Sequence, residues 1–169
     1  MCTSSCGKPK TYALWHFFYL GDLASRRDGQ LQRLDAGEIL VAAELYRMGA
    51  SRDIGDCHAR LGQIFESTRI VNKPDELRRD PLPSYDRAVE LGSQRGMLYR
   101  GLYQFNRLAD GVLDVERDRV TVRQGVEDLI KAAQGARGFP GARVILMRWR
   151  AVMPEIVSEN DLRRSGLLQ

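Results

Sequence analysis

The stretch 84–103 constrains the fold more than any other part of this chain of 169 residues. One helical pattern ends at Gly92, and a second begins at Gly96 and carries Gly101. Glycine allows a tight turn and leaves room for another backbone, so it is expected where a chain reverses or where two helices approach closely. The stretch therefore predicts the second helix of one hairpin, a tight turn and the first helix of the next hairpin.

A related pattern recurs before and after this stretch. In each first helix a small residue is followed five positions later by a second small or compact one, as in Cys57–Gly62, Gly96–Gly101 and Ala142–Met147. The copies are unequally spaced along the chain. Hairpins of constant length joined by loops of variable length are typical of helical repeat proteins.

Apolar periodicity and turn residues predict the order of the elements. Asp35 is expected to cap one helix, with Glu38 completing the capping-box spacing, and Asp56 is expected to cap the next. Segments 71–83 and 110–118 are expected to be irregular loops, the first because of its three prolines. The expected helices cover 11–25, about 36–49, 57–65, 83–92, 96–109, about 126–133 and 142–152.

The length favours a single domain. We expect an all-α fold, an α-solenoid of about three antiparallel helical hairpins plus a closing helix, because a lone hairpin cannot bury its apolar side. Residues 1–10 are interpreted as a flexible leader, 11–154 as the repeat domain and 155–169 as a C-terminal tail, mostly polar, with a frayed end.

The segment from Ala59 to Phe65 resembles the first helix of a Sel-one-like repeat, a relative of the tetratricopeptide repeat. The match consists of an Ala, then Leu61-Gly62, then an aromatic residue; 87–92 and 131–135 fit other parts of the same pattern. The resemblance covers most of residues 12–152. Arg100 and Met147 depart from it, because they stand in positions where the family has Leu and Gly.

The resemblance implies a curved surface lined by the first helices of the hairpins. If Leu61-Gly62 packs inward, one set of side chains lies near the concave side. A mixture of acidic, amide, apolar and Arg groups is typical of a protein-binding surface. Leu102 and Phe105 are equally consistent with the core. The predicted partner-binding residues are Asp22, Gln63, Glu66, Leu102, Phe105 and Arg148.

The charge of the chain is +4, but its basic residues alternate with Asp and Glu instead of clustering. This interleaving indicates a solvated mixed-charge surface and argues against nucleic-acid binding, which requires a stripe of one sign. No stretch approaches the roughly 20 apolar residues of a membrane span. Cys57 fits a small core position. Cys6, in a polar leader, resembles the lipidated start of a bacterial lipoprotein, although no hydrophobic segment precedes it. We expect a cytoplasmic protein, or a periplasmic or lipid-anchored one if an upstream signal has been removed.

The sequence contains no catalytic signature, so we expect neither an enzyme nor a cofactor. Cys57 and His58 are adjacent on a helix and point about 100° apart, so they cannot easily share a metal or act as nucleophile and base. No metal site is expected, and Glu127-Asp128 is interpreted as a solvated helix face.

We therefore expect a non-catalytic protein–protein interaction module. By family analogy it is an adaptor, or an immunity protein that binds and neutralises a secreted bacterial effector or an envelope protein. Two alternatives remain open: an enzymatic or small-molecule-binding domain with a groove near Tyr99, Tyr103 and Trp149, and a structural envelope lipoprotein.

Overall fold

The computed structural model describes residues 36–67, 72–135 and 139–168. Within these ranges the fold is all-α, without strands. The expected helix 11–25, the leader, Asp22 and the capping residue Asp35 lie outside the described residues. The elements are α2 (Ala36–Ala50), α3 (Gly55–Glu66), the 3₁₀ turn η1 (Asp75–Leu77), α4 (Leu82–Glu90), α5 (Gln94–Ala109), α6 (Arg119–Gln134), α7 (Pro140–Val152) and α8 (Glu159–Arg164).

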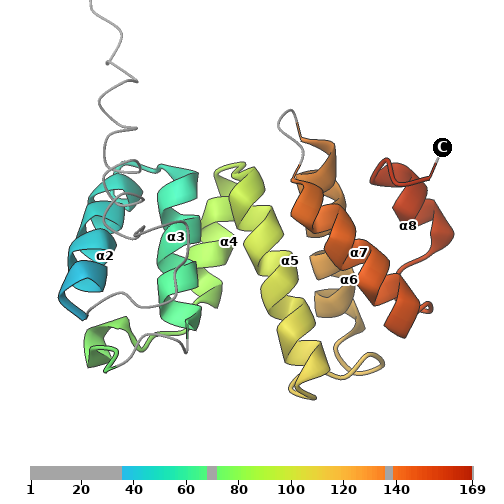
Figure 1. The fold of residues 1–169 in the computed structure, drawn as a ribbon, viewed down its shortest axis with the longest axis horizontal. Coiled ribbons are helices and arrows are strands. Elements are labelled where there is room, and N and C mark those ends of the chain that lie inside the picture. The colour runs from blue at the N-terminus through green and yellow to red at the C-terminus, as the bar shows by residue number, and fades with distance from the viewer. Residues whose placement is uncertain (1–35, 68–71, 136–138, 169) are drawn as a thin grey trace, which may run out of the picture.

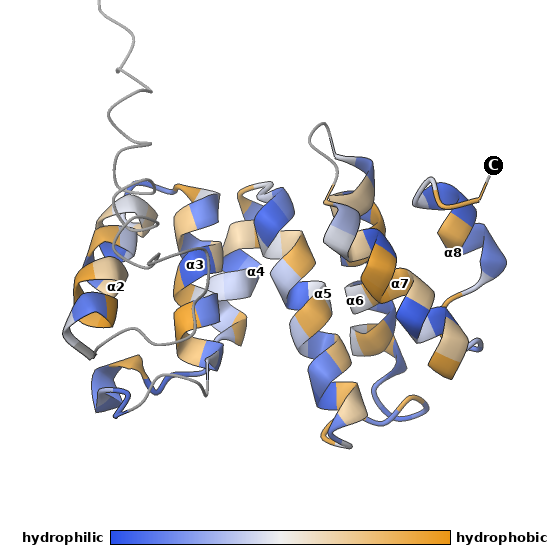
Figure 2. Cartoon of the chain, viewed as in Figure 1, coloured by the Kyte–Doolittle hydropathy of each residue, from blue (hydrophilic) through white to orange (hydrophobic). Residues whose placement is uncertain are grey.

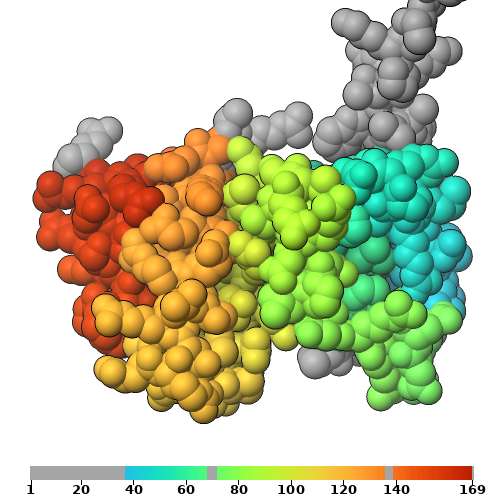
Figure 3. All heavy atoms as spheres, turned by 180° about the vertical axis from the view of Figure 1, so that it is seen from behind, coloured from blue at the N-terminus to red at the C-terminus, as the bar shows by residue number. Residues whose placement is uncertain are grey.

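The helices form an elongated stack in chain order (Figure 1). Each helix from α2 to α8 packs against the next one, and α3 also packs on α5, α5 on α7 and α6 on α8. Contacts between alternate helices join one hairpin to the next, which confirms the predicted α-solenoid. Helix α6 lies behind α7 in Figure 1 and faces the viewer in the opposite view (Figure 3). We call α3, α5 and α7 the front helices.

Glycines stand at the closest approaches, as the sequence pattern predicts. A Cβ atom at Gly96 would lie 2.5 Å from the Cβ of Ala88, where α4 meets α5. A Cβ atom at Gly101 would lie 2.6 Å from Cγ of Leu129 and 2.9 Å from a backbone oxygen of α6. Gly92 has a φ of +74°, so it serves as the turn residue between α4 and α5.

Apolar side chains gather in two clusters. The first joins α2, α3 and η1, and its buried members include Ile39, Tyr46, Cys57, Leu61 and Leu77. The second joins α5 to α8, and its fully buried members include Val126, Leu129, Leu146, Trp149 and Val157. The position of Cys57 in the first cluster agrees with its interpretation as a core residue. Figure 2 shows the resulting pattern, in which hydrophobic and hydrophilic segments alternate around each helix.

The proline-rich loop before α4 is tied to the end of α3. Lys73 Nζ donates to the carbonyl oxygens of Phe65 at 2.6 Å and Ser67 at 3.1 Å. Leu77, in the 3₁₀ turn η1, is buried in the first apolar cluster. The loop is therefore irregular, as its prolines predict, yet it contributes to the core.

Three predicted helix starts require correction, and the largest difference is at α6, which begins at Arg119, seven residues before the expected position. Asp56 does not cap α3, which begins at Gly55 after Ile54. Its carboxylate instead accepts a hydrogen bond from the hydroxyl of Ser93 at 2.5 Å. Ser93 is the N-cap of α5, because its Oγ accepts from the backbone N–H of Gly96 at 3.0 Å. Helix α5 consequently starts at Gln94, two residues before the expected position.

The segment after Pro154 contains more structure than the expected polar tail. Ser158 and Asp161 form a capping box in which each side chain accepts from the backbone of the other, and α8 follows. Ile156, Val157 and Leu162 are buried in the second apolar cluster. These residues belong to the folded unit because their apolar side chains complete the core beside α6 and α7.

Candidate protein-binding surface

The predicted partner-binding residues lie on successive front helices. Gln63 and Glu66 are on α3, Leu102 and Phe105 are on α5, and Arg148 is on α7. Asp22 lies outside the described residues. Since α3 packs on α5 and α5 on α7, the sequence placed these residues on helices that are neighbours in space.

Glu66 connects three helices. Its carboxylate accepts from the hydroxyl of Tyr85 on α4 at 2.6 Å and from Nδ2 of Asn106 on α5 at 3.3 Å. Burial and the neighbouring Glu66 carboxylate raise the pKa of Tyr85 well above its usual range. Tyr85 therefore stays protonated and donates to Glu66.

Tyr85 is the centre of a cluster of three tyrosines. Its ring centroid lies 6.4 Å from that of Tyr99 and 5.8 Å from that of Tyr103, both in tilted arrangements. Gly62 makes space for the ring, because a Cβ atom there would lie 2.6 Å from Cδ1 of Tyr85. The Leu-Gly pair recognised in the sequence thus seats the fully buried Tyr85, and this positions the half-buried Tyr99 and Tyr103 beside it.

Arginines hold the outer part of this cluster. Arg60 donates to Oε1 of Gln63 at 2.7 Å and to the hydroxyl of Tyr99 at 3.1 Å. The guanidinium of Arg107 lies 5.6 Å from the ring centroid of Tyr103, within the range of a cation–π contact. We define the front surface as Arg60, Gln63, Glu66, Tyr99, Leu102, Tyr103, Asn106 and Arg107.

Phe105 does not belong to this surface. Its ring stacks on Trp149 with centroids 4.7 Å apart and packs against the second apolar cluster. Trp149 is fully buried, so it does not line an open groove with Tyr99 and Tyr103. Of the two residues that the sequence left between surface and core, Phe105 serves the core, whereas Leu102 is only partly buried.

An ion pair that sequence reasoning missed lies behind the front surface. Arg100 donates to both carboxylate oxygens of Asp128 on α6, at 2.6 and 3.0 Å, and to Asp86 on α4 at 2.7 Å. The Asp128 side chain is 1% exposed, so the interpretation of Glu127-Asp128 as a solvated face is wrong for Asp128. Arg100 stands where the repeat pattern has Leu. An arginine at such an inward position was the available sequence signal, because a buried arginine requires a carboxylate that faces it.

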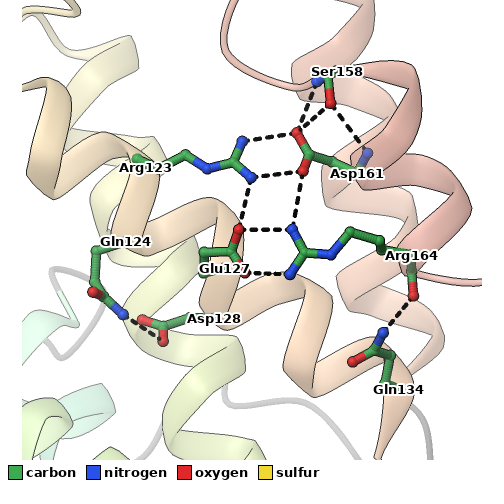
Figure 4. A network of polar contacts seen from close by, with 8 residues as sticks. All are labelled: Arg123, Gln124, Glu127, Asp128, Gln134, Ser158, Asp161 and Arg164. Atoms are coloured by element: carbon green, nitrogen blue, oxygen red, sulfur yellow. Dashed lines mark hydrogen bonds and ion pairs between the residues drawn. The ribbon is translucent and has the colours of Figure 1, made fainter.

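A second network fixes α8 to α6 (Figure 4). Arg123 donates to the two oxygens of Asp161 at 2.8 and 2.7 Å, and Arg164 donates to those of Glu127 at 2.9 and 2.7 Å. The hydrogen bonds from Arg123 hold the pKa of Asp161 well below its usual range. The spacing of Ser158 and Asp161 was the sequence signal for this helix start. The network is structural, because all its charges are paired within the fold.

The described residues contain no group of three or more His, Cys, Asp or Glu side chains that could hold a metal ion. Burial lowers the pKa of His58. Among the same residues, no helix is both long and apolar enough to cross a membrane.

No protein-family model, curated protein or solved structure matches this chain significantly.

Proposed function

We propose that this protein is a non-catalytic protein-binding module that holds its partner across the front helices. One observation carries the proposal, namely two hydrogen bonds that join α3 to α5. Arg60 donates to the hydroxyl of Tyr99, and Asn106 donates to the carboxylate of Glu66. Tyr and Arg dominate the energetics of protein interfaces. Side chains that are already ordered lose less conformational entropy on binding.

The family resemblance supports a finer proposal. The partner is a secreted bacterial effector or an envelope protein, and binding neutralises or retains it. This step rests on the repeat motif around Leu61-Gly62 as an analogy and not on any contact of the front surface.

The test is an affinity capture from a lysate of the source organism with the full chain as bait, followed by quantitative mass spectrometry. Asn106→Arg alters the front surface at an exposed position on α5, and Arg148→Glu alters the exposed side of α7. Lys131→Glu, at an exposed position on α6, is the matched charge-reversal control. Phe105 is left unaltered, because a charged side chain there would disturb the stacking on Trp149.

A partner of the front helices is expected to be depleted about tenfold or more by the α5 or α7 variant, corresponding to roughly 1.4 kcal/mol. The control should retain it. If both variants capture every specific partner as well as the unaltered chain does, the front helices are not the binding surface.

A further inference from the structure

The outer side of α7 carries an apolar stripe that the described part of the fold does not cover. Val144, Met147 and Val152 are 48%, 53% and 70% exposed. Ala151 is exposed as well, and the spacing of 144, 147 and 151 places these three side chains on one side of a helix. The opposite side is fully buried at Ala142, Leu146 and Trp149, so α7 is firmly seated while its outer side is open. Figure 2 shows hydrophobic segments along α7 in the view in which it lies in front of α6.

Two exposed arginines accompany the stripe. Arg148 lies one turn from Val144, and Arg143 one turn from Met147. Helix α7 contains no Asp or Glu, and its third arginine, Arg150, donates to the carbonyl of Val157 at 2.8 Å. Among the described residues neither Arg143 nor Arg148 forms an ion pair, in contrast to the arginines that hold Asp128 and Asp161. A partner surface complementary to this stripe would therefore carry apolar groups flanked by carboxylates.

We propose that the outer side of α7 binds an acidic amphipathic helix of a partner protein. The proposal rests on the proposed function in taking the partner to be a protein. A helix fits because it can lay apolar side chains at three- and four-residue spacing along α7 while its flanking carboxylates reach the two arginines. These charge pairs steer the encounter and set the orientation, and the apolar stripe supplies the buried area.

Charge argues against the two occupants that the chain itself offers. A second copy would bring the three arginines of one α7 against the three of another without a carboxylate on either helix. The segment 1–35 carries an apolar run, but it also carries five Lys or Arg residues against three Asp and no Glu. A second copy would add positive charge to a surface that is already positive, and the apolar run 12–20 contains no carboxylate that could pair with Arg143 or Arg148.

The experiment uses the full chain and a synthetic helical peptide with Leu on one face and Glu on both flanks. A matched peptide has Lys in place of every Glu. Fluorescence anisotropy measures the affinity of the unaltered chain, of the double variant Arg143→Glu with Arg148→Glu, and of the exposed control Lys131→Glu on α6. Circular dichroism and thermal unfolding check that each variant remains folded.

The unaltered chain and the control are expected to bind the Glu peptide and not the Lys peptide. The double variant should bind the Glu peptide about tenfold or more weakly and should prefer the Lys peptide. Higher salt should weaken the binding of the unaltered chain. Failure of the Glu peptide to bind, or equal binding to the double variant, would overturn the proposal.

A photo-crosslinking amino acid at the exposed position 151, on the same side as Val144 and Met147, identifies the occupant directly. Cross-links to the Glu peptide support the proposal, whereas cross-links to residues 1–35 or to a second copy overturn it. A natural partner that is lost with Asn106→Arg, together with no binding of the Glu peptide, would leave the proposed function standing and reject only the acidic helix.

Discussion

The buried ion pair between Arg100 and Asp128 allows the sharpest test of how this solenoid is held together. Removing one partner leaves the other charge in a site built for a pair. Asp128→Leu would remove one of the two carboxylates that pair with Arg100, whose side chain is only 13% exposed, and would leave Asp86 as its remaining partner. Arg100→Leu would leave the Asp128 carboxylate, whose side chain is 1% exposed, without a cation. Its remaining contact would be the 3.4 Å hydrogen bond from Nε2 of Gln124.

The two single substitutions should differ in cost. Breaking a buried pair from one side typically costs about 3–5 kcal/mol. We expect Arg100→Leu to fall at the upper end of this range, because it leaves the more deeply buried charge. Asp128→Leu should fall at the lower end, because Asp86, at 46% side-chain exposure, still accepts from Arg100 at 2.7 Å. The double variant should cost less than Arg100→Leu alone, because it buries no unpaired charge.

Urea unfolding followed by circular dichroism measures the four free energies of unfolding in this cycle. The slope with urea should not change, because the surface exposed on unfolding is nearly the same in every variant. Additive costs in the double variant would refute the reasoning, because they would mean that the two charges do not stabilise each other. A cost under about 1 kcal/mol for Arg100→Leu would refute it as well, because a buried lone carboxylate is more costly than that.

Three further predictions follow from single contacts. The pKa of Asp161 is depressed in the fold, so its contribution to stability is complete above the ordinary pKa of an unfolded aspartate, about 3.9. This contribution is lost as the pH falls through the lower folded-state pKa. The difference in unfolding free energy between the unaltered chain and Asp161→Asn should therefore be constant from pH 7 to 5 and shrink below pH 4; a constant difference down to pH 2 would contradict this. Gly101→Ala should lower the unfolding free energy by about 1–3 kcal/mol. Gly141→Ala, in the first turn of α7 where a Cβ meets nothing within 4 Å, should instead raise it by up to about 1 kcal/mol, because Ala favours the helix over Gly; equal effects of the two substitutions would count against close helix packing at Gly101. Tyr85→Phe removes the hydroxyl that donates to Glu66 and should cost about 1 kcal/mol in urea unfolding, and an unchanged midpoint would argue that this hydrogen bond contributes nothing net.

Sequence reasoning located the helices well because their signals are local. Apolar spacing, Gly92 and the prolines before α4 act within a few residues of chain, so they predicted the hairpins and both irregular loops. Helix starts were less predictable. Asp56 has the right character for a cap, but Ser93, 37 residues away, engages its carboxylate instead.

The candidate surface was predicted in part for the same reason. Gln63 and Glu66 follow from the position of Leu61-Gly62, because a helix fixes which neighbours share a side. The tyrosine cluster was missed, because Tyr85 comes from α4 and meets Tyr99 and Tyr103 of α5 only after the hairpins stack. Phe105 could not be assigned from the sequence, because an apolar residue at this position of α5 is expected both on a binding surface and in the core against Trp149.

The sequence by itself determined that this chain is helical and that its hairpins repeat, because both properties depend on the periodicity of apolar residues. It also determined that small residues mark the helix contacts, because a glycine without a side chain leaves room for a neighbouring helix. Only the tertiary structure decided which charges are buried, which aromatic rings meet, and that α7 keeps an uncovered apolar side beside Arg143 and Arg148. Burial and charge pairing depend on what arrives from distant parts of the chain, and no local pattern specifies that.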